Sequence, residues 1–335
     1  MLVCGTMHLK RNMAEHYFCV TIDVEPDCTP TWHYSNPLTF AGVRTGIGER
    51  LQPLFNRFGI KPTYLINNVV LEDQESVDVF KNLPGEFELG THLHPEFIAP
   101  SKQYSDYAGK KAEANCCFYP PEVEYEKLKS ITELFTGQFG YQPVSFRAGR
   151  FSCGSNTIQS LKRLGYKVDT SVTPHVSWKD KSREKPVDFT AAPEQPYFID
   201  DNNLLKEDPD SSLLQVPVSI IPVRNNRYKE AAKSLFGLRR KMKFTRPLWL
   251  RPVYADYNEM IGIAESIKSR YANQPSIVLN MMFHNVEVME GLSPYTQDQN
   301  QVERYLETLE NFFQYTIRSG IQSKTLNEVY ARYKA

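Results

Sequence analysis

Two short segments of this sequence place carboxylates and imidazoles at the ends of strand-like runs. The first apolar run leads into Asp23 and Glu25, and a later run leads into His92 and His94. Side chains two residues apart in extended backbone point to the same side, so each pair shares one face. Two imidazoles and one or two carboxylates that face one cavity suit a divalent ion of the zinc or iron type. The spacing therefore predicts a divalent metal site.

Arg147, Arg150, Asp169 and His284 stand at or near the ends of later strand-like runs. Parallel barrels place catalytic groups at the carboxyl ends of their strands, because the loops there converge on one opening. We therefore expect these residues to face the same opening as the metal pair. Structural alternatives stay open for each of them. Either arginine could form a structural or surface ion pair. Asp169, like Asp23, could cap the turn that follows it, and His284 could be a buried core histidine.

Short apolar, β-branched runs alternate with helix-period segments along almost the whole chain. The predicted strands are 18–23, 61–66, 86–90, 144–147, 166–172, 214–220 and 276–284. Amphipathic helical periodicity lies between them, for example over 47–58, where Gly59 is the expected stop. Such alternation predicts parallel strands joined by crossover helices. Six or seven units in about 320 residues favour a barrel over a narrow open sheet.

Composition excludes several classes of protein. The 335 residues are 41% hydrophobic and 23% charged, close to an average globular protein. Lys plus Arg and Asp plus Glu both number 39, so the excess of positive charge that a general grip on nucleic acid needs is missing. No run approaches the roughly 20 apolar residues of a transmembrane segment. Six scattered cysteines form neither a disulfide framework nor a zinc ribbon pattern.

The domain prediction is a flexible tail over residues 1–15 and a single domain over 16–335 with two long insertions. The insertion near 184–210 has a net charge of −6, and the one near 224–251 has a net charge of +9. Both could be solvated loops that pair with each other. Alternatively, the basic insertion could dock an anionic substrate or a phosphorylated lipid carrier. Because the first residues lack the apolar core of a secretory signal, we expect a cytoplasmic protein.

The polar segments also resemble a known family when they are taken in order. They fall in the sequence of the NodB-type polysaccharide deacetylases, which are relatives of carbohydrate esterase family 4, and their style is similar to the WalW-like branch. The matching segments are Thr21-Ile22-Asp23-Val24-Glu25, Gly90-Thr91-His92-Leu93-His94-Pro95, Phe146-Arg147-Ala148-Gly149-Arg150-Phe151 and Phe283-His284. The resemblance spans roughly residues 17–330. It implies an α/β fold, namely a distorted (β/α)7 barrel, together with a divalent metal and deacetylation of a sugar.

The sequence departs from the family pattern in two places. The family usually has two adjacent aspartates in its first motif, whereas here Val24 follows Asp23. Valine cannot bind a metal, so Glu25 is the natural substitute. The second motif usually spaces its histidines by three or four residues. His92 matches the first histidine, and the second ligand is then His94 or Glu96.

The resemblance implies a role for each matching residue. Glu25, His92 and His94 would hold the ion, which would be zinc, with cobalt, nickel or iron as the other possibilities. Asp23 would be the general base, and Arg147 would pair with it. Backbone N–H groups near Phe151 would stabilise the oxyanion, with Arg150 as a further substrate contact. His284, kept protonated by Asp169, would protonate the leaving group.

The predicted function is metal-dependent removal of acetyl groups from an N- or O-acetylated sugar during cell-surface polysaccharide biosynthesis. The substrate would be a glycan or a sugar precursor linked to a lipid or a nucleotide. Trp32, Trp178 and Trp249 lie in predicted loops, where flat aromatic faces often line sugar sites. One alternative is a catalytically inactive protein that binds a sugar or a partner. The other is a metal-independent amide hydrolase on the same barrel.

Overall fold

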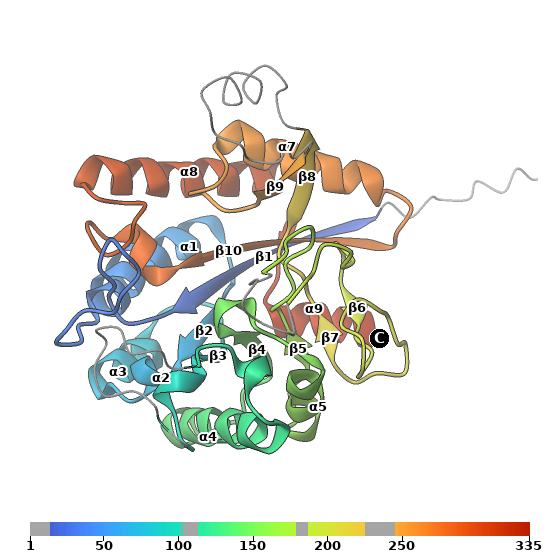
Figure 1. The fold of residues 1–335 in the computed structure, drawn as a ribbon. Helices are drawn as coiled ribbons and strands as arrows, with labels where there is room; N and C mark the ends of the chain where they lie inside the picture. Colours follow the sequence, from blue (N-terminus) through green and yellow to red (C-terminus); the bar gives the residue numbers. More distant parts are fainter. Residues whose placement is uncertain (1–13, 101, 103–112, 179–186, 225–244) are drawn as a thin grey trace, which may run out of the picture.

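The computed structural model of this chain describes residues 14–100, 102, 113–178, 187–224 and 245–335. Within these residues, seven strands run parallel in one curled sheet (Figure 1). In sheet order they are β10 (Ser276–His284), β1 (Glu15–Val24), β2 (Pro62–Asn67), β3 (Glu88–Leu93), β4 (Ser145–Ala148), β5 (Val168–Asp169) and β7 (Leu214–Gln215). The antiparallel strand β6 (Tyr197–Phe198) lies beyond β7, and β11 (Gln322–Ser323) pairs with β1.

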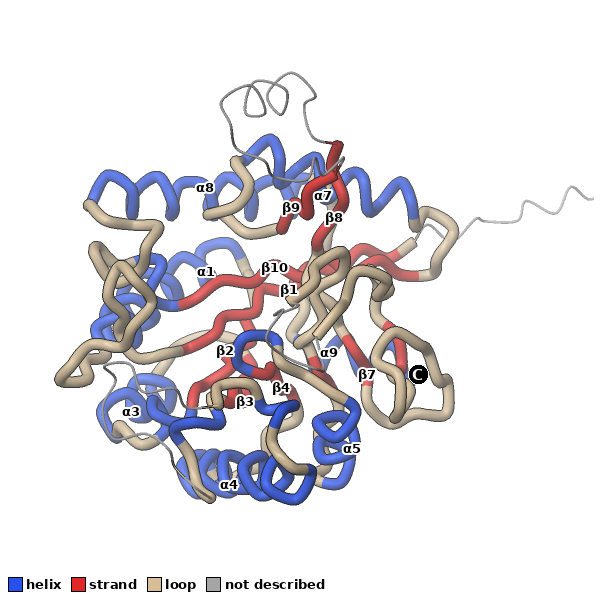
Figure 2. Tube along the Cα trace, viewed as in Figure 1, coloured by secondary structure: helices blue, strands red, loops and turns tan. Residues whose placement is uncertain are grey.

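Helices surround this sheet on its outer side, as Figure 2 shows. The longer ones are α1 (Gln52–Phe58), α3 (Gln74–Asn82), α4 (Pro121–Phe139), α5 (Ser155–Arg163), α7 (Tyr257–Arg270), α8 (Gln299–Arg318) and α9 (Leu326–Lys334). Shorter turns are η1 (Gly42–Leu51, a π-helix that runs into α1), α2 (Asn68–Leu71), η2 (Pro95–Phe97), η3 (Cys116–Phe118), η4 (Gly149–Phe151) and η5 (Asn285–Val288). No helix in the described residues is both long and apolar enough to cross a membrane.

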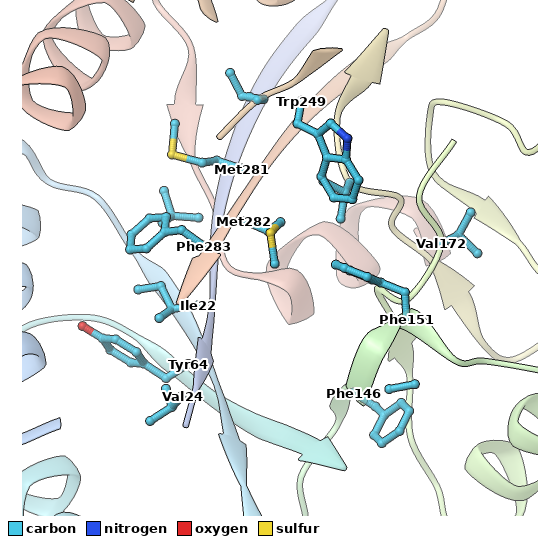
Figure 3. Close-up of a cluster of buried hydrophobic side chains, with 14 of the residues drawn as sticks. Ile22, Val24, Tyr64, Phe146, Phe151, Val172, Trp249, Met281, Met282 and Phe283 are labelled. Carbon is cyan, nitrogen blue, oxygen red and sulfur yellow. The ribbon is translucent and has the colours of Figure 1, made fainter. Parts of the chain in front are cut away.

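The observed strands confirm most of the predicted ones, and the alternation of side chains along them divides the core into two layers. Figure 3 shows Ile22, Met281 and Phe283 on one side of β1 and β10, whereas Met282 points the other way, toward Phe151. The first group packs against the helices; for example, α8 brings an aromatic ring to within 5.5 Å of Phe18 in β1. The opposite side of the strands faces the inside of the barrel. Thus β1 and β10 bury both of their faces.

The fifth and sixth predicted strands are much shorter than expected. Residues 166–172 contain only the two-residue β5, and residues 214–220 contain the two-residue β7 and the first residue of β8 (Ile220–Arg224). The chain leaves the sheet because β8 pairs instead with β9 (Thr245–Trp249) in a separate antiparallel hairpin. Of this hairpin, β9 lies within the predicted basic insertion near 224–251, whereas β8 precedes the insertion and ends at its first residue. Residues 225–244 of that insertion, residues 184–186 of the acidic insertion and the predicted tail up to residue 13 lie outside the described residues.

One backbone hydrogen bond and several side-chain hydrogen bonds, rather than a paired strand, bridge the gap between β10 and the segments that face it. Ser219 N donates to Asn280 O at 2.9 Å, and Asn280 N donates to Ser219 Oγ at 2.8 Å. The amide of Gln195 bonds both the carbonyl (3.1 Å) and the N–H (2.8 Å) of Val278. Backbone groups that would be exposed at the edge strand are thereby satisfied. The curled sheet closes into a distorted barrel in this way.

Glu124 is a carboxyl group buried between α4 and α5. Its Oε1 accepts a hydrogen bond from Thr157 Oγ1, and its Oε2 has no hydrogen-bond partner among the described residues. Burial, only partly opposed by the Thr157 and Cys116 side chains, raises the pKa of Glu124 to about 7. In the folded chain, the neutral form of this carboxyl group is therefore favoured over the charged form.

Replacing Glu124 with glutamine should remove a pH dependence of stability. The unfolded glutamate titrates near 4.5, so between about pH 4.5 and 7 the folded chain binds more protons than the unfolded chain and loses stability as the pH rises. We expect the free energy of unfolding of the wild type, relative to Glu124→Gln, to fall by up to about 3 kcal/mol over this interval. Urea unfolding at pH 5 and 7.5 measures it. Glu122→Gln, an exposed site on the same helix, is the control and should track the wild type. Parallel profiles for the wild type and Glu124→Gln would contradict the assignment.

Candidate metal centre

The carboxyl ends of β1, β3, β4 and β10 bring the predicted polar residues to one end of the barrel. In the sheet register, Asp23 lies beside His284, and His92 lies beside Arg147. Val24 is fully buried in the hydrophobic core, on the helix-facing side of β1. The residues on either side of it, Asp23 and Glu25, therefore point the other way, into the barrel.

Arg147 is completely buried, and its guanidinium fills the interior of the barrel below the opening. Its Nη1 donates to Asp23 Oδ1 at 2.6 Å, its Nη2 donates to Thr21 Oγ1 at 2.7 Å, and its Nε donates to the carbonyl of Thr170 at 3.0 Å. Burial by itself would raise the pKa of Asp23, but Arg147, His92 and His284 outweigh it and hold that pKa below its ordinary value. Asp23 is therefore ionised and fixed in place.

Glu25, His92 and His94 form a three-membered cluster of possible metal ligands. Glu25 Oε1 lies 3.2 Å from His92 Nε2 and 3.3 Å from His94 Nε2, and the two Nε2 atoms are 3.2 Å apart. Neighbouring ligand atoms of a tetrahedral zinc site lie roughly 3.3 Å apart, given metal–ligand bonds of about 2.0–2.1 Å. Two imidazoles and one carboxylate also form a donor set that zinc prefers. The residues present therefore fit a divalent ion.

Each member of the cluster is oriented by a second contact, as is usual for metal ligands. The ring Nδ1 of His92 lies 3.1 Å from the carbonyl of Arg147, which can only accept, so Nδ1 carries the proton and Nε2 is free to coordinate. Tyr34 donates to the second carboxylate oxygen of Glu25 at 2.9 Å. The side-chain amide of Asn285 bonds both the N–H and the carbonyl of Glu25, at 2.9 and 3.0 Å, and so fixes its backbone.

His94 is a buried imidazole that lies between two carboxylates. Burial would lower its pKa, but the Glu25 and Glu96 carboxylates raise the pKa of His94 to about 9. Glu96 lies on the outer side of the ring, with Oε1 3.8 Å from His94 Nδ1 and 2.8 Å from Arg150 Nη1. Of the two candidates for the second ligand of this segment, the geometry thus favours His94. Glu96 is instead a contact that orients it.

The segment after β4 approaches His94 very closely. A Cβ atom on Gly149 would lie 2.6 Å from the carbonyl of Leu93 and 2.8 Å from Cδ2 of His94, so only glycine fits. The next two residues, Arg150 and Phe151, have φ angles of 54° and 53°, in the left-handed region that costs non-glycine residues about 1 kcal/mol or more. Strain of this kind clusters at functional sites. Both side chains lie at the mouth, Phe151 within 5.9 Å of the Arg147 guanidinium.

His284 is partly exposed at the mouth, next to the cluster. Its Nε2 lies 3.9 Å from Asp23 Oδ2 and 3.7 Å from Glu25 Oε1. Its Nδ1 lies 2.9 Å from Glu287 Oε1 and 3.1 Å from Arg251 Nη2. His284 therefore faces the carboxylates of Asp23 and Glu25 with its Nε2. With its Nδ1 it contacts the separate ion pair of Glu287 and Arg251.

Asp169 lies apart from His284, contrary to the expected pairing. Its two oxygens accept from the hydroxyl of Ser171 at 2.6 Å and from the N–H of Ser171 at 3.1 Å. Burial, opposed by these bonds, raises the pKa of Asp169 to about 6. In the described residues no contact joins it to His284, so the geometry favours the alternative role of capping a turn. The carboxylate that contacts Nδ1 of His284 is that of Glu287.

Tyr34, Arg251 and Glu287 are among the polar residues at this site that the sequence did not single out. Glu287 has a detectable signal in the sequence, because it stands three residues after a strand-terminal histidine. One helical turn between the two residues brings their side chains to the same side. Arg251 appeared only as part of a basic segment. Tyr34 lies in a loop and carries no spacing signal.

The fold is the distorted (β/α)7 barrel of the NodB polysaccharide deacetylase type. No protein-family model and no curated protein matches this sequence. Among solved structures, a Mycobacterium smegmatis protein assigned as a polysaccharide deacetylase is similar with a TM-score of 0.53 and 12% identity, over 96% of this chain and 91% of that one. A Pseudomonas aeruginosa PAO1 protein assigned as a polysaccharide deacetylase reaches 0.53 and 13%, over 95% and 90%.

A third solved structure has the same fold, but its name describes a different reaction. Puue allantoinase is similar with a TM-score of 0.52 and 13% identity, over 97% of this chain and 92% of that one. One barrel therefore occurs in proteins named for different reactions, and the reaction has to be argued from the site.

His92→Ala should abolish metal binding, because it removes one of three ligands and the anchor to β4. Protein purified without chelators and then dialysed should hold about one zinc per chain in the wild type and none in the variant, as measured by elemental mass spectrometry. His33→Ala is the control, since His33 is exposed in a loop. Retention of stoichiometric metal by His92→Ala would contradict the proposed ligand set.

Gly149→Ala should weaken metal binding without removing a ligand, because the new methyl group displaces His94. Perturbing a contact that orients a ligand typically costs 10–100-fold in affinity. Competition with a chromogenic chelator measures the zinc dissociation constant. Gly137→Ala, in α4 with open space around its Cβ position, is the control. An unchanged dissociation constant in Gly149→Ala would show that His94 is not a ligand or tolerates the shift.

Proposed function

We propose that this protein is a metal-dependent hydrolase that removes acetyl groups from an N- or O-acetylated sugar in cell-surface polysaccharide biosynthesis. The observation that carries the proposal is the convergence of three groups at one opening. These are a metal-binding cluster, a carboxylate fixed by a buried arginine, and a histidine with one nitrogen free. The similarity in fold to proteins assigned as polysaccharide deacetylases supports the same reaction class.

Glu25, His92 and His94 would hold the ion, which when bound supplies Lewis acidity and makes water acidic enough to react near neutral pH. Asp23 is the general base. Its Oδ1 is occupied by Arg147, so Oδ2, 3.9–4.0 Å from the Nε2 atoms of His284 and His92, is the oxygen left to accept the proton of the attacking water. Since its pKa is low, Asp23 stays ionised and ready to accept throughout the neutral range.

His284 is the general acid. As the bond between the acetyl carbon and the sugar nitrogen or oxygen breaks, Nε2–H of the imidazolium transfers its proton to that atom, and a neutral imidazole remains. Because Asp23 and His284 sit on adjacent strands in register, base and acid lie on neighbouring sides of one opening. Backbone N–H groups near Phe151 are the proposed oxyanion donors, and Arg150 is the proposed substrate contact.

Aromatic rings at the opening support a sugar as the substrate. Trp32 lies with its ring centre 4.9 Å from that of His284, and Trp178 stacks on Phe151 at 5.5 Å and 17°. Trp32 is 37% exposed and Trp178 is 40% exposed, so each offers part of its surface to solvent. Trp249, in contrast, is 7% exposed and packs beneath Phe151 and Trp178, as ordinary core. Flat aromatic surfaces beside polar groups suit the apolar face of a sugar ring.

The cytoplasmic location, the single domain over 16–335 and the membership of the WalW-like branch stay predictions from the sequence. A lipid- or nucleotide-linked precursor is a separate proposal. It rests on the positive charge of residues 224–251, most of which lie outside the described residues.

Acetate release from acetylated sugars tests the proposed function. Zinc-, cobalt- or nickel-loaded protein should release acetate from acetylated oligosaccharides, and chelation should abolish the release. His284→Ala should lose at least about 100-fold in kcat while it keeps its metal, since its duty is proton transfer. His33→Ala should match the wild type in both measurements.

Two results would overturn the proposal. Full amide hydrolysis after chelation would favour a metal-independent hydrolase. Absence of both stoichiometric metal and acetate release would favour a protein that binds a sugar or a partner without turnover.

A further inference from the structure

A buried ion pair outside the metal cluster meets His284 at its second ring nitrogen. Glu287 is completely buried and Arg251 is 4% exposed, and one oxygen of the carboxylate bonds the guanidinium. The other oxygen accepts from the hydroxyl of Tyr305 at 2.9 Å. Such a pair is expensive to desolvate and is destabilising when one partner is lost. A hydrophobic contact at the same place would have avoided this desolvation free energy.

The geometry shows what this pair does to the histidine. Glu287 Oε1 lies 2.9 Å from His284 Nδ1 and 3.1 Å from its backbone N–H, so one carboxylate oxygen holds both the ring and the main chain of His284. Burial would raise the pKa of Glu287, but Arg251 and His284 outweigh it and keep that pKa below its ordinary value. The carboxylate is therefore ionised and can only accept, which places a proton on Nδ1.

Arg251 also approaches Nδ1, at 3.1 Å, and it can only donate. Nδ1 cannot accept from Arg251 and donate to Glu287 at once. The charge-assisted bond to the carboxylate is the stronger of the two, and the guanidinium Nη2 is already engaged by the same carboxylate. Glu287 thus decides the tautomer, and Arg251 is held back from the ring only while Glu287 is charged.

We propose that Glu287, with Arg251 as its counter-ion, is the positioning residue that keeps the proton on Nδ1 of His284 and turns Nε2 toward the reaction. The inference rests on the proposed function, in which His284 is the proton donor. It gives Glu287 the role that the family resemblance implies for Asp169. Without the charge on Glu287, Arg251 donates to Nδ1, and the neutral ring then carries its one proton on Nε2. That proton belongs to a neutral imidazole, which is far too weak an acid to transfer it to a departing amine.

Two substrates that differ in leaving group separate this role from a merely structural one. An N-acetylated sugar loses an amine that must be protonated as it departs, whereas 4-nitrophenyl acetate loses a phenolate that needs no proton. In Glu287→Gln we expect kcat on the N-acetylated sugar to fall about 100-fold with KM within twofold of the wild type. The turnover of 4-nitrophenyl acetate should stay within about threefold of the wild-type value. The zinc content should not change. Glu287→Asp, which keeps the charge, should recover part of the loss.

Glu290→Gln is the matched control, because Glu290 is exposed just after the same turn and should leave both substrates unaffected. Equal losses on the two substrates, loss of zinc, or no loss at all would overturn the proposal.

A spectroscopic measurement separates this outcome from a failure of the proposed function. Nitrogen-15 NMR of histidine-labelled protein as purified reports the proton on each ring nitrogen, and His284→Ala identifies the signals. A protonated Nδ1 in the wild type that becomes unprotonated in Glu287→Gln supports the positioning role, even in a protein that releases no acetate. An Nδ1 state that is the same in both proteins contradicts it.

Discussion

The organisation of the opening depends on one buried interaction, the ion pair between Arg147 and Asp23. A guanidinium without solvent must have its N–H groups satisfied, because an unpaired buried charge costs several kcal/mol. Arg147 meets this demand with groups from two parts of the chain: Asp23 and Thr21 on β1, and Thr170 just after β5. Arg147 thereby ties β4 to β1 across the interior of the barrel and to the segment after β5, next to the cluster of possible metal ligands.

That pair also separates the tasks of two carboxylates that lie two residues apart. Asp23 has one oxygen bound to Arg147, and Glu25 has one oxygen bound to Tyr34, so each presents its other oxygen to the imidazoles. Oε1 of Glu25 lies 3.2–3.3 Å from the Nε2 atoms of His92 and His94. Oδ2 of Asp23 lies 3.9–4.0 Å from the Nε2 atoms of His284 and His92. This difference in distance supports Glu25 as a metal ligand and Asp23 as a general base, rather than both residues as ligands.

Much of this arrangement could be predicted from the sequence, because period-two alternation and strand ends are local properties. The last predicted strand, 276–284, coincides with β10, and the shared face of His92 and His94 follows from their spacing. The lengths of β5 and β7 could not be predicted, since β8 leaves the sheet for a hairpin partner more than twenty residues away. The contact of Arg251 with Glu287 depends on that same hairpin. The pairing of Asp169 with His284 follows only from the family resemblance, whereas the three-residue spacing between His284 and Glu287 is a local signal for the contact that the structure shows.

The presence of Val24, at a position where the NodB-type pattern has a second aspartate, has a physical explanation. In a strand with both faces buried, the position after Asp23 must serve the helix-facing layer, and Val24 packs there with Ile22 and Tyr64. A ligand from β1 must therefore come from the next inward position, and glutamate, one methylene longer than aspartate, still reaches the imidazoles. Val24 in the core layer and Glu25 inside the barrel are in this sense two consequences of the same alternation along β1. Backbone constraints at Gly149 and Asn285 support it, because they fix His94 and Glu25 at the separation that a shared ion requires.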